Sequence, residues 1–202
     1  KTNTASMVKV GPRDTDTPSS ADQPPAAPSP YWADETIWNS QTTVHSFAMD
    51  KQARVWAAAR VRKPETPKWC QAGSDHPSAK LMPINQGQRG LIMYDPKTKK
   101  VTQIDTCFTW GHLNFDDNDV IWSSFGPAGI EGWFDVKAWD KTHDEKASQG
   151  WSAFVVDNNG NGKRDAYTEP NQPADATKDR RMGFTFYGDS PAPDGSVWGT
   201  VQ

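Results

Sequence analysis

The chain has 202 residues, of which only 35% are hydrophobic, but 10 Trp and 8 Phe are present, so large rings must fill the core of one domain or two small ones. The 15 Gly and 16 Pro exclude a helical bundle, and no apolar stretch reaches the roughly 18 to 20 residues of a membrane span. A net charge of −3 leaves no basic stripe for nucleic-acid binding.

The first 30 residues are rich in proline, serine and threonine and offer almost no side chain to bury. Such a composition predicts an extended or disordered linker over residues 1–30. We expect the folded part to begin near Tyr31.

After Tyr31 one pattern occurs three times, beginning near Val44, Gly111 and Phe184. Each copy is a short alternating strand, an Asp-containing tight turn and a second strand that carries a tryptophan, which is typical of a β-hairpin. We expect Asp50 and Asp117 to cap the first two turns.

A further hairpin is predicted over residues 91–105, where proline fixes the turn. It follows the first copy of the pattern, so the two hairpins together predict a four-stranded antiparallel meander. A four-stranded unit with one tryptophan that repeats after several tens of residues is typical of a β-propeller blade.

The sequence therefore predicts an all-β fold, a β-propeller segment of antiparallel four-stranded blades with long loop insertions. It would occupy residues 31–202, with blades at about 38–106, 107–182 and 183–202. Two complete blades and the start of a third fall short of the roughly four to eight blades of a closed ring. We therefore expect the remaining blades, in the same gene product or in other chains, as partners that complete the ring.

Two cysteines are present, Cys70 and Cys107, and their spacing fits no zinc-binding pair. They either form a disulfide that closes a 37-residue loop (107 − 70) or remain two buried thiols. Each borders an irregular segment in which a covalent link would be useful. We predict the disulfide, and with it an oxidising location, periplasmic or secreted.

Residues 157–165 read Asp-Asn-Asn-Gly-Asn-Gly-Lys-Arg-Asp, close to the spacing of an EF-type calcium loop. Calcium takes oxygen ligands, which such a loop supplies from alternate positions with a glycine at the sixth. A structural Ca²⁺ site is predicted, with Lys163 contributing its carbonyl and Glu169 standing one place later than usual: Asp157, Asn159, Asn161, Lys163, Asp165 and Glu169. The alternative is an Asn-Gly loop without metal, since both residue types tolerate positive φ.

Two histidines, His45 and His112, occupy the same place on the first strand of successive repeats, and Tyr187 takes that place in the third. That strand lines the channel of a propeller, so both imidazoles are predicted to approach one ligand or metal. Histidine has a suitable pKa for acid–base catalysis near neutrality, which makes the pair a catalytic candidate. The alternative is that both histidines only pack between strands. A second shared position, assigned to packing between blades, holds Trp56, Trp122 and Trp198.

No G-x-S-x-G, phosphate-binding glycine loop or H-E-x-x-H motif occurs in the sequence. His76 lies in a Pro/Gly-rich insertion with Ser78 and Lys80 nearby. We expect a structural role for it, with a catalytic one left open.

The repeated units that resemble a known family are His45…Asp50…Val55-Trp56 and His112…Asp117…Ile121-Trp122. They are similar to blades of streptogramin lyase (virginiamycin B lyase)-like propellers. The stretch from about Tyr31 to Gln202 also resembles uncharacterised secreted bacterial proteins that carry such a propeller behind a carboxypeptidase-regulatory-like domain. In the lyases, the resemblance implies, histidine on these strands lies next to a magnesium ion and serves an elimination.

Two functions follow as expectations. The first is a non-catalytic scaffold of the bacterial envelope that binds a glycan, a peptide or a partner protein, and it is preferred because no complete catalytic set is visible. The alternative is a metal-assisted lyase, in which His45 or His112 moves a proton while Mg²⁺ stabilises the developing anion.

Overall fold

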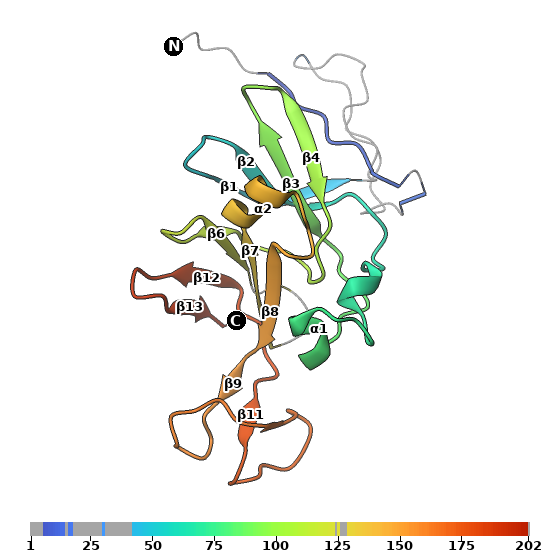
Figure 1. Ribbon diagram of the computed structural model, residues 1–202. Helices are drawn as coiled ribbons and strands as arrows, with labels where there is room; N and C mark the ends of the chain where they lie inside the picture. The colour runs from blue at the N-terminus through green and yellow to red at the C-terminus, as the bar shows by residue number, and fades with distance from the viewer. Residues whose placement is uncertain are drawn as a thin grey trace.

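Strands, nearly all of them in antiparallel pairs, are the main secondary structure of the computed structural model, which describes residues 6–14, 16–17, 30, 42–123, 125 and 129–201 (Figure 1). Two four-stranded sheets follow one another along the described chain, and each is an antiparallel meander. The predicted all-β class with antiparallel four-stranded sheets is confirmed. Among the described residues, no helix combines the length and the apolar character that crossing a membrane requires.

The first sheet consists, in spatial order, of β1 (Thr43–Met49), β2 (Val55–Arg60), β3 (Gly90–Asp95) and β4 (Lys100–Ile104). The pairing of β1 with β2 shifts between Val44 and Ser46, which leaves His45 as the extra residue of a β-bulge. The insertion between β2 and β3 contains a short 3₁₀ helix, η1 (Lys68–Cys70), and α1 (Pro77–Leu81).

The second sheet consists of β5 (Asn114–Phe115), β6 (Val120–Ser123), β7 (Ile130–Asp135) and β8 (Gln149–Ala153), with α2 (Val136–Thr142) between the last two strands. A small sheet follows, in which β11 (Asp179–Arg181) lies between β10 (Tyr167–Thr168) and β9 (Val155–Val156). The described chain ends with the predicted third hairpin, β12 (Gly188–Pro191) and β13 (Val197–Thr200).

The turns of the first two hairpins share one pattern of hydrogen bonds to an aspartate. Asp50 accepts hydrogen bonds from the backbone amides two and four residues ahead and from the indole Nε1 of Trp56, six residues ahead. Asp116 accepts the same three hydrogen bonds, the last from Trp122. The expectation that Asp117 caps the second turn is therefore wrong by one residue, because the carboxylate must stand six residues before the tryptophan.

The third turn has the same backbone and lacks the carboxylate. Ala192 stands six residues before Trp198 and makes the two backbone hydrogen bonds that Asp50 makes in its own turn. Without an aspartate there, the indole Nε1 of Trp198 donates to the Ser196 hydroxyl at 2.9 Å. The three hairpins are thus repeats of one structural unit, as the sequence pattern predicts.

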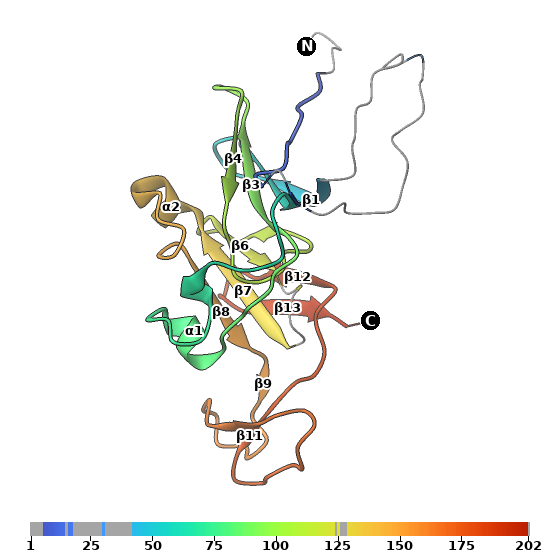
Figure 2. The same cartoon turned by 90° about the vertical axis from the view of Figure 1, so that its right-hand side faces the viewer.

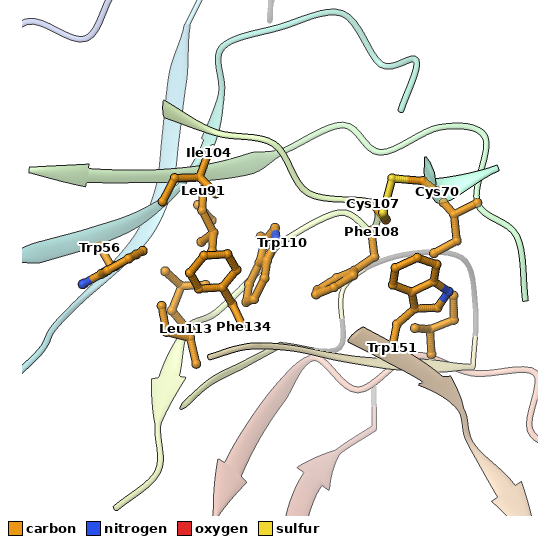
Figure 3. Packing of buried hydrophobic residues seen from close by; sticks show 14 of the residues in the cluster. Trp56, Cys70, Leu91, Ile104, Cys107, Phe108, Trp110, Leu113, Phe134 and Trp151 are labelled. Atoms are coloured by element: carbon orange, nitrogen blue, oxygen red, sulfur yellow. A yellow bond between two sulfur atoms is a disulfide. The ribbon is translucent and has the colours of Figure 1, made fainter. Parts of the chain in front are cut away.

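One apolar core joins the two four-stranded sheets (Figure 3). Trp56 from the first sheet packs against Phe134 of the second, with 5.7 Å between ring centroids. Figure 3 shows the Cys70–Cys107 disulfide in the same core, near Phe108. The bond predicted from the sequence is confirmed. Large rings fill this core, as the composition predicts.

The second sheet is covered on both faces. Along β7, Ile130 and Phe134 belong to the core shared with the first sheet, and Phe108 packs on Gly132. Glu131 lies on the opposite face, toward the third hairpin, because side chains alternate along a strand. The first sheet, the second sheet and the third hairpin therefore follow one another as layers (Figure 2).

The outer face of the first sheet contacts the N-terminal segment. Val10 packs on a small cluster that includes Ala57 and Ile92, and the Arg13 guanidinium lies 2.6 Å from the Asp105 carboxylate. Residues 6–14 contain no helix or strand, but they lie along the sheet rather than apart from it. Tyr31, the expected start of the fold, lies outside the described residues.

Candidate functional site

The repeat position of the three hairpins comes together in space, although only His45 lies on a strand, and His112 and Tyr187 lie just before β5 and β12. The imidazole rings of His45 and His112 are stacked, with 5.3 Å between centroids and 4° between planes. Tyr187 meets His112 edge-on, with 4.8 Å between centroids and 88° between planes. The structure therefore brings together the three side chains that the repeat pattern places in equivalent positions.

Two further side chains complete this group. The Phe125 ring lies 6.0 Å from His45 and 6.2 Å from Tyr187, and the guanidinium of Arg89 lies 5.3 Å from the Phe125 centroid. We call these five residues, His45, Arg89, His112, Phe125 and Tyr187, the inner cluster. Arg89 was not identified from the sequence, because it belongs to an insertion and shares no repeat position.

Local backbone features hold the inner cluster in place. The β-bulge at His45 allows its side chain to stack on that of His112. The hydroxyl of the adjacent Ser46 donates a hydrogen bond to the carbonyl of Gly111, the residue before His112. Gly111 is required by packing, since a Cβ there would lie 2.4 Å from the ring of Phe125. The first and second sheets are thus connected at the inner cluster itself.

The inner cluster is accessible and positively charged. His45 and Tyr187 are exposed, and the other three side chains are half-buried. Partial burial lowers the pKa of His45, and the positive charges of Arg89 and His112 lower it further. Among the described residues, no carboxylate contributes to that shift, and none of them gives the imidazole of His45 an anionic neighbour that would favour its protonated form.

Magnesium does not fit the inner cluster as these residues form it. Mg²⁺ prefers oxygen ligands, whereas the cluster offers two imidazoles, a phenol and a cation. In the conformation shown, and across the part of the chain that the structure describes, no three His, Cys, Asp or Glu side chains are close enough together to hold a metal ion. The chemistry that the inner cluster supports is hydrogen bonding and charge pairing with an anion.

His76 has a structural role. It is 4% exposed, its Nε2 lies 3.2 and 3.1 Å from the carbonyl oxygens of Lys146 and Gln149, and its Nδ1 accepts the amide of Ser78 at 3.2 Å. The ring also stacks on Trp151, 4.8 Å away. Both ring nitrogens are occupied by backbone groups, so nothing in this arrangement supports the catalytic role that the sequence leaves open.

The residues of the predicted calcium loop do not all lie together. Within the loop between β9 and β10, Asp165 Oδ2 accepts hydrogen bonds from the side-chain amides of Asn159 and Asn161, at 2.9 and 2.5 Å. Lys163 donates its backbone amide to Asn161 Oδ1 at 2.8 Å. Glu169 instead forms an ion pair with Arg181 at 2.7 Å.

A buried acid between the second sheet and the third hairpin was missed. Glu131 on β7 is 8% exposed, and within the described part of the chain neither of its carboxyl oxygens has a hydrogen-bond partner. Burial raises its pKa to about 9, with a contribution from the charge of the buried Asp189 on β12. The alternation of β7 places Glu131 on the face away from the core, where its charged neighbour Asp189 belongs to the third hairpin.

Replacing Glu131 with glutamine is expected to remove a pH-dependent loss of stability. Because the folded-state pKa of Glu131 is raised to about 9, the unfolded chain releases this proton at lower pH than the folded chain does. Wild-type stability therefore falls as pH rises through the interval between the two pKa values. From about pH 6 to pH 8, the free energy of unfolding should fall by about 2 to 3 kcal/mol relative to Glu131→Gln.

Urea unfolding at each pH measures this difference. The matched control is Glu65→Gln, because the side chain of Glu65 is 69% exposed. Its stability should follow that of the wild type at every pH. Parallel pH profiles for the wild type and Glu131→Gln would contradict the prediction.

The chain matches no protein-family model, no curated protein and no solved structure. The similarity to streptogramin lyase-like propellers therefore stays an expectation from the repeated units. The function has to be argued from the inner cluster and from the repeat architecture.

Proposed function

We propose that this chain is part of a non-catalytic binding scaffold built from propeller-type blades, and that the inner cluster binds an anionic group of the ligand. The observation that carries the proposal is the meeting of His45, His112 and Tyr187, which stand at equivalent places in three repeats. Equivalent positions on successive blades face a common axis, so a ligand there contacts several repeats at once.

The character of the inner cluster supports an organic anion. Arg89 and two imidazoles supply N–H donors that pair with a carboxylate, and the rings of Phe125 and Tyr187 offer apolar surface beside them. A carboxylate-bearing sugar or an acidic peptide has both features. Because partial burial and then the positive neighbours depress the pKa of His45, a bound anion should offset the effect of those charges and favour the protonated imidazole.

An NMR titration tests the proposal. D-glucuronate should raise the pKa of His45 by about 0.5 to 1, and glucose, which has no charge, should leave it unchanged. His143 is the internal control, because it caps the C-terminus of α2, away from the inner cluster. Arg89→Gln should weaken the response. Equal effects of glucuronate on His45 and His143 would show a general ionic effect and contradict the proposal.

The lyase alternative rests on the same pair of histidines. It is favoured by the 5.3 Å separation of their rings, which allows both to reach one substrate. It also needs a divalent cation, and the positive neighbours of His45 oppose one. Mg²⁺ added in the same titration distinguishes the two functions, since the scaffold predicts no change at His45 or His112.

Apolar side chains are exposed at both ends of the layered arrangement, and this exposure favours the proposal that partners complete a ring. On β1, an edge strand of the first sheet, Phe47 is 74% exposed and Met49 63% exposed. At the other end, Trp198 on β13 is 70% exposed. We propose that further blades, from the same gene product or from other chains, cover these surfaces. The disulfide favours a periplasmic or secreted location for the whole assembly.

A further inference from the structure

The loop of residues 157–166 is framed by the small three-stranded sheet. The loop leaves the end of β9 and returns at β10, the two outer strands, and β11 lies between them. β11 begins at Asp179, which pairs with Tyr167 at the start of β10. Asp179 therefore stands at the base of the loop, between its two ends. This unit projects away from the larger sheets (Figures 1 and 2).

Polar side chains of the loop turn inward. The Asp157 carboxylate accepts the backbone amides of Gly160 and Gly162, both at 2.7 Å. The side-chain amides of Asn159 and Asn161 converge on one oxygen of Asp165. Two N–H groups thus bring partial positive charge close to one carboxylate oxygen of Asp165. In a metal-binding loop, the cation provides the positive charge at this place.

Asp179 provides an independent indication of a ligand. Its side chain is 1% exposed, and its Oδ2 accepts the backbone amide of Asp165 at 2.6 Å, so the carboxylate faces the loop. Its other oxygen, Oδ1, is buried and has no hydrogen-bond partner among the residues that the structure describes. A buried carboxylate oxygen without a donor is unfavourable, and such a group calls for a water or an ion that satisfies it.

We propose that this loop binds a single Ca²⁺ and that Asp179 supplies the carboxylate expected from Glu169. Glu169 is held by Arg181, whereas Asp179 already contacts the loop at Asp165. Asp157, Asp165 and Asp179 provide three negative charges, and Asn159 and Asn161 provide amide oxygens. The amides hold Asp165 in the present conformation, so the cation displaces them and draws the carboxylates together.

Isothermal titration of the chelator-treated full chain with Ca²⁺ tests the assignment. The wild type should bind one ion, and Asp179→Asn should weaken binding at least about tenfold, because it removes one ligand charge and keeps the acceptor for the Asp165 amide. Glu169→Gln is the matched control and should bind Ca²⁺ like the wild type. Asn161→Asp should tighten binding by about tenfold, because it adds a ligand charge.

Thermal melting separates loss of binding from loss of folding. In excess chelator, Asp179→Asn should melt at or above the wild-type temperature, because the substitution removes an unpaired buried charge. Millimolar Ca²⁺ should raise the melting temperature of the wild type and of Glu169→Gln, but not that of Asp179→Asn. A wild type that neither binds Ca²⁺ nor melts higher with it would overturn the site. Loss of binding in Glu169→Gln with retention in Asp179→Asn would overturn the role of Asp179.

Discussion

Replacing Cys70 and Cys107 together with alanine is expected to lower the free energy of unfolding by about 3 to 4 kcal/mol. The disulfide joins residues 37 positions apart, and its loss restores the conformational entropy of that loop to the unfolded chain. Both sulfur atoms lie in the core, where each cysteine is 0% exposed. Urea unfolding of the double variant, compared with the wild type, measures the effect.

Loss of the disulfide should also loosen α1, which lies within the 37-residue loop that the disulfide closes. His76 at the start of this helix stacks on Trp151, and the Trp151 indole donates to the Met82 carbonyl at 2.7 Å. Wild-type protein reduced with dithiothreitol is the control, and it should unfold at the same urea concentration as the double variant. If the double variant unfolds at the same urea concentration as the oxidised wild type, the stabilising role of the disulfide is refuted.

Asp50→Ala is expected to destabilise the fold by about 3 to 5 kcal/mol, the range for removing one partner of a buried charged pair. Asp50 is 6% exposed, accepts the indole of Trp56 at 2.8 Å and pairs with the Arg54 guanidinium at 2.6 Å. Arg54 also pairs with Asp140 on α2, at 2.6 Å. The substitution therefore leaves a buried indole N–H unpaired and weakens the contact between the first sheet and α2.

The effect of Asp50→Ala should depend on pH in a defined direction. Burial raises the pKa of Asp50, but the hydrogen bonds from Trp56 and Arg54 outweigh it, so the pKa is lowered overall. A lowered pKa contributes stability above the unfolded-state value, about 3.9, and this contribution is lost as pH falls through the folded-state pKa. Urea unfolding should show the gap between wild type and variant narrowing below about pH 4.

The third turn offers the reverse substitution as a control. Ala192→Asp places a carboxylate six residues before Trp198, as in the first two turns. It should raise stability by about 0.5 to 1.5 kcal/mol, the usual value of an intramolecular hydrogen bond. A loss of stability in Ala192→Asp, or an unchanged stability in Asp50→Ala, would show that the carboxylate does not stabilise these turns.

The hairpins could be predicted because the information that specifies them is local. Strand alternation and turn residues identify each hairpin, and the position of tryptophan identifies the repeat. The choice between Asp116 and Asp117 was not accessible in the same way, because two spacings disagree: counting five residues from the histidine selects Asp117, whereas counting six back from the tryptophan selects Asp116. Only the pairing of β5 with β6 shows that Asp116 reaches the indole of Trp122.

The parts of the candidate sites that escaped prediction depend on contacts between distant segments. The charge of Asp189, more than fifty residues later in the sequence, acts on Glu131, and Arg89 joins the inner cluster from an insertion. Similarly, nothing in the local sequence shows that Arg181 engages Glu169 or that Asp179 lies under the loop. Local patterns identify the Asn- and Asp-rich loop, but long-range pairing decides which further acid lies next to it.

The β-bulge at His45 affects how the sequences of these hairpin repeats should be aligned and how the repeats can change by insertion. Counted back from the turn aspartates, Ser46 rather than His45 corresponds to His112, since both stand four residues before their aspartate. The bulge absorbs this offset, so an alignment with fixed spacing would pair the wrong residues. Because side chains alternate along a strand, one codon gained or lost before the turn exchanges the side chain that joins the inner cluster. A single-residue insertion can therefore change the chemistry of the inner cluster while the packed core stays unchanged.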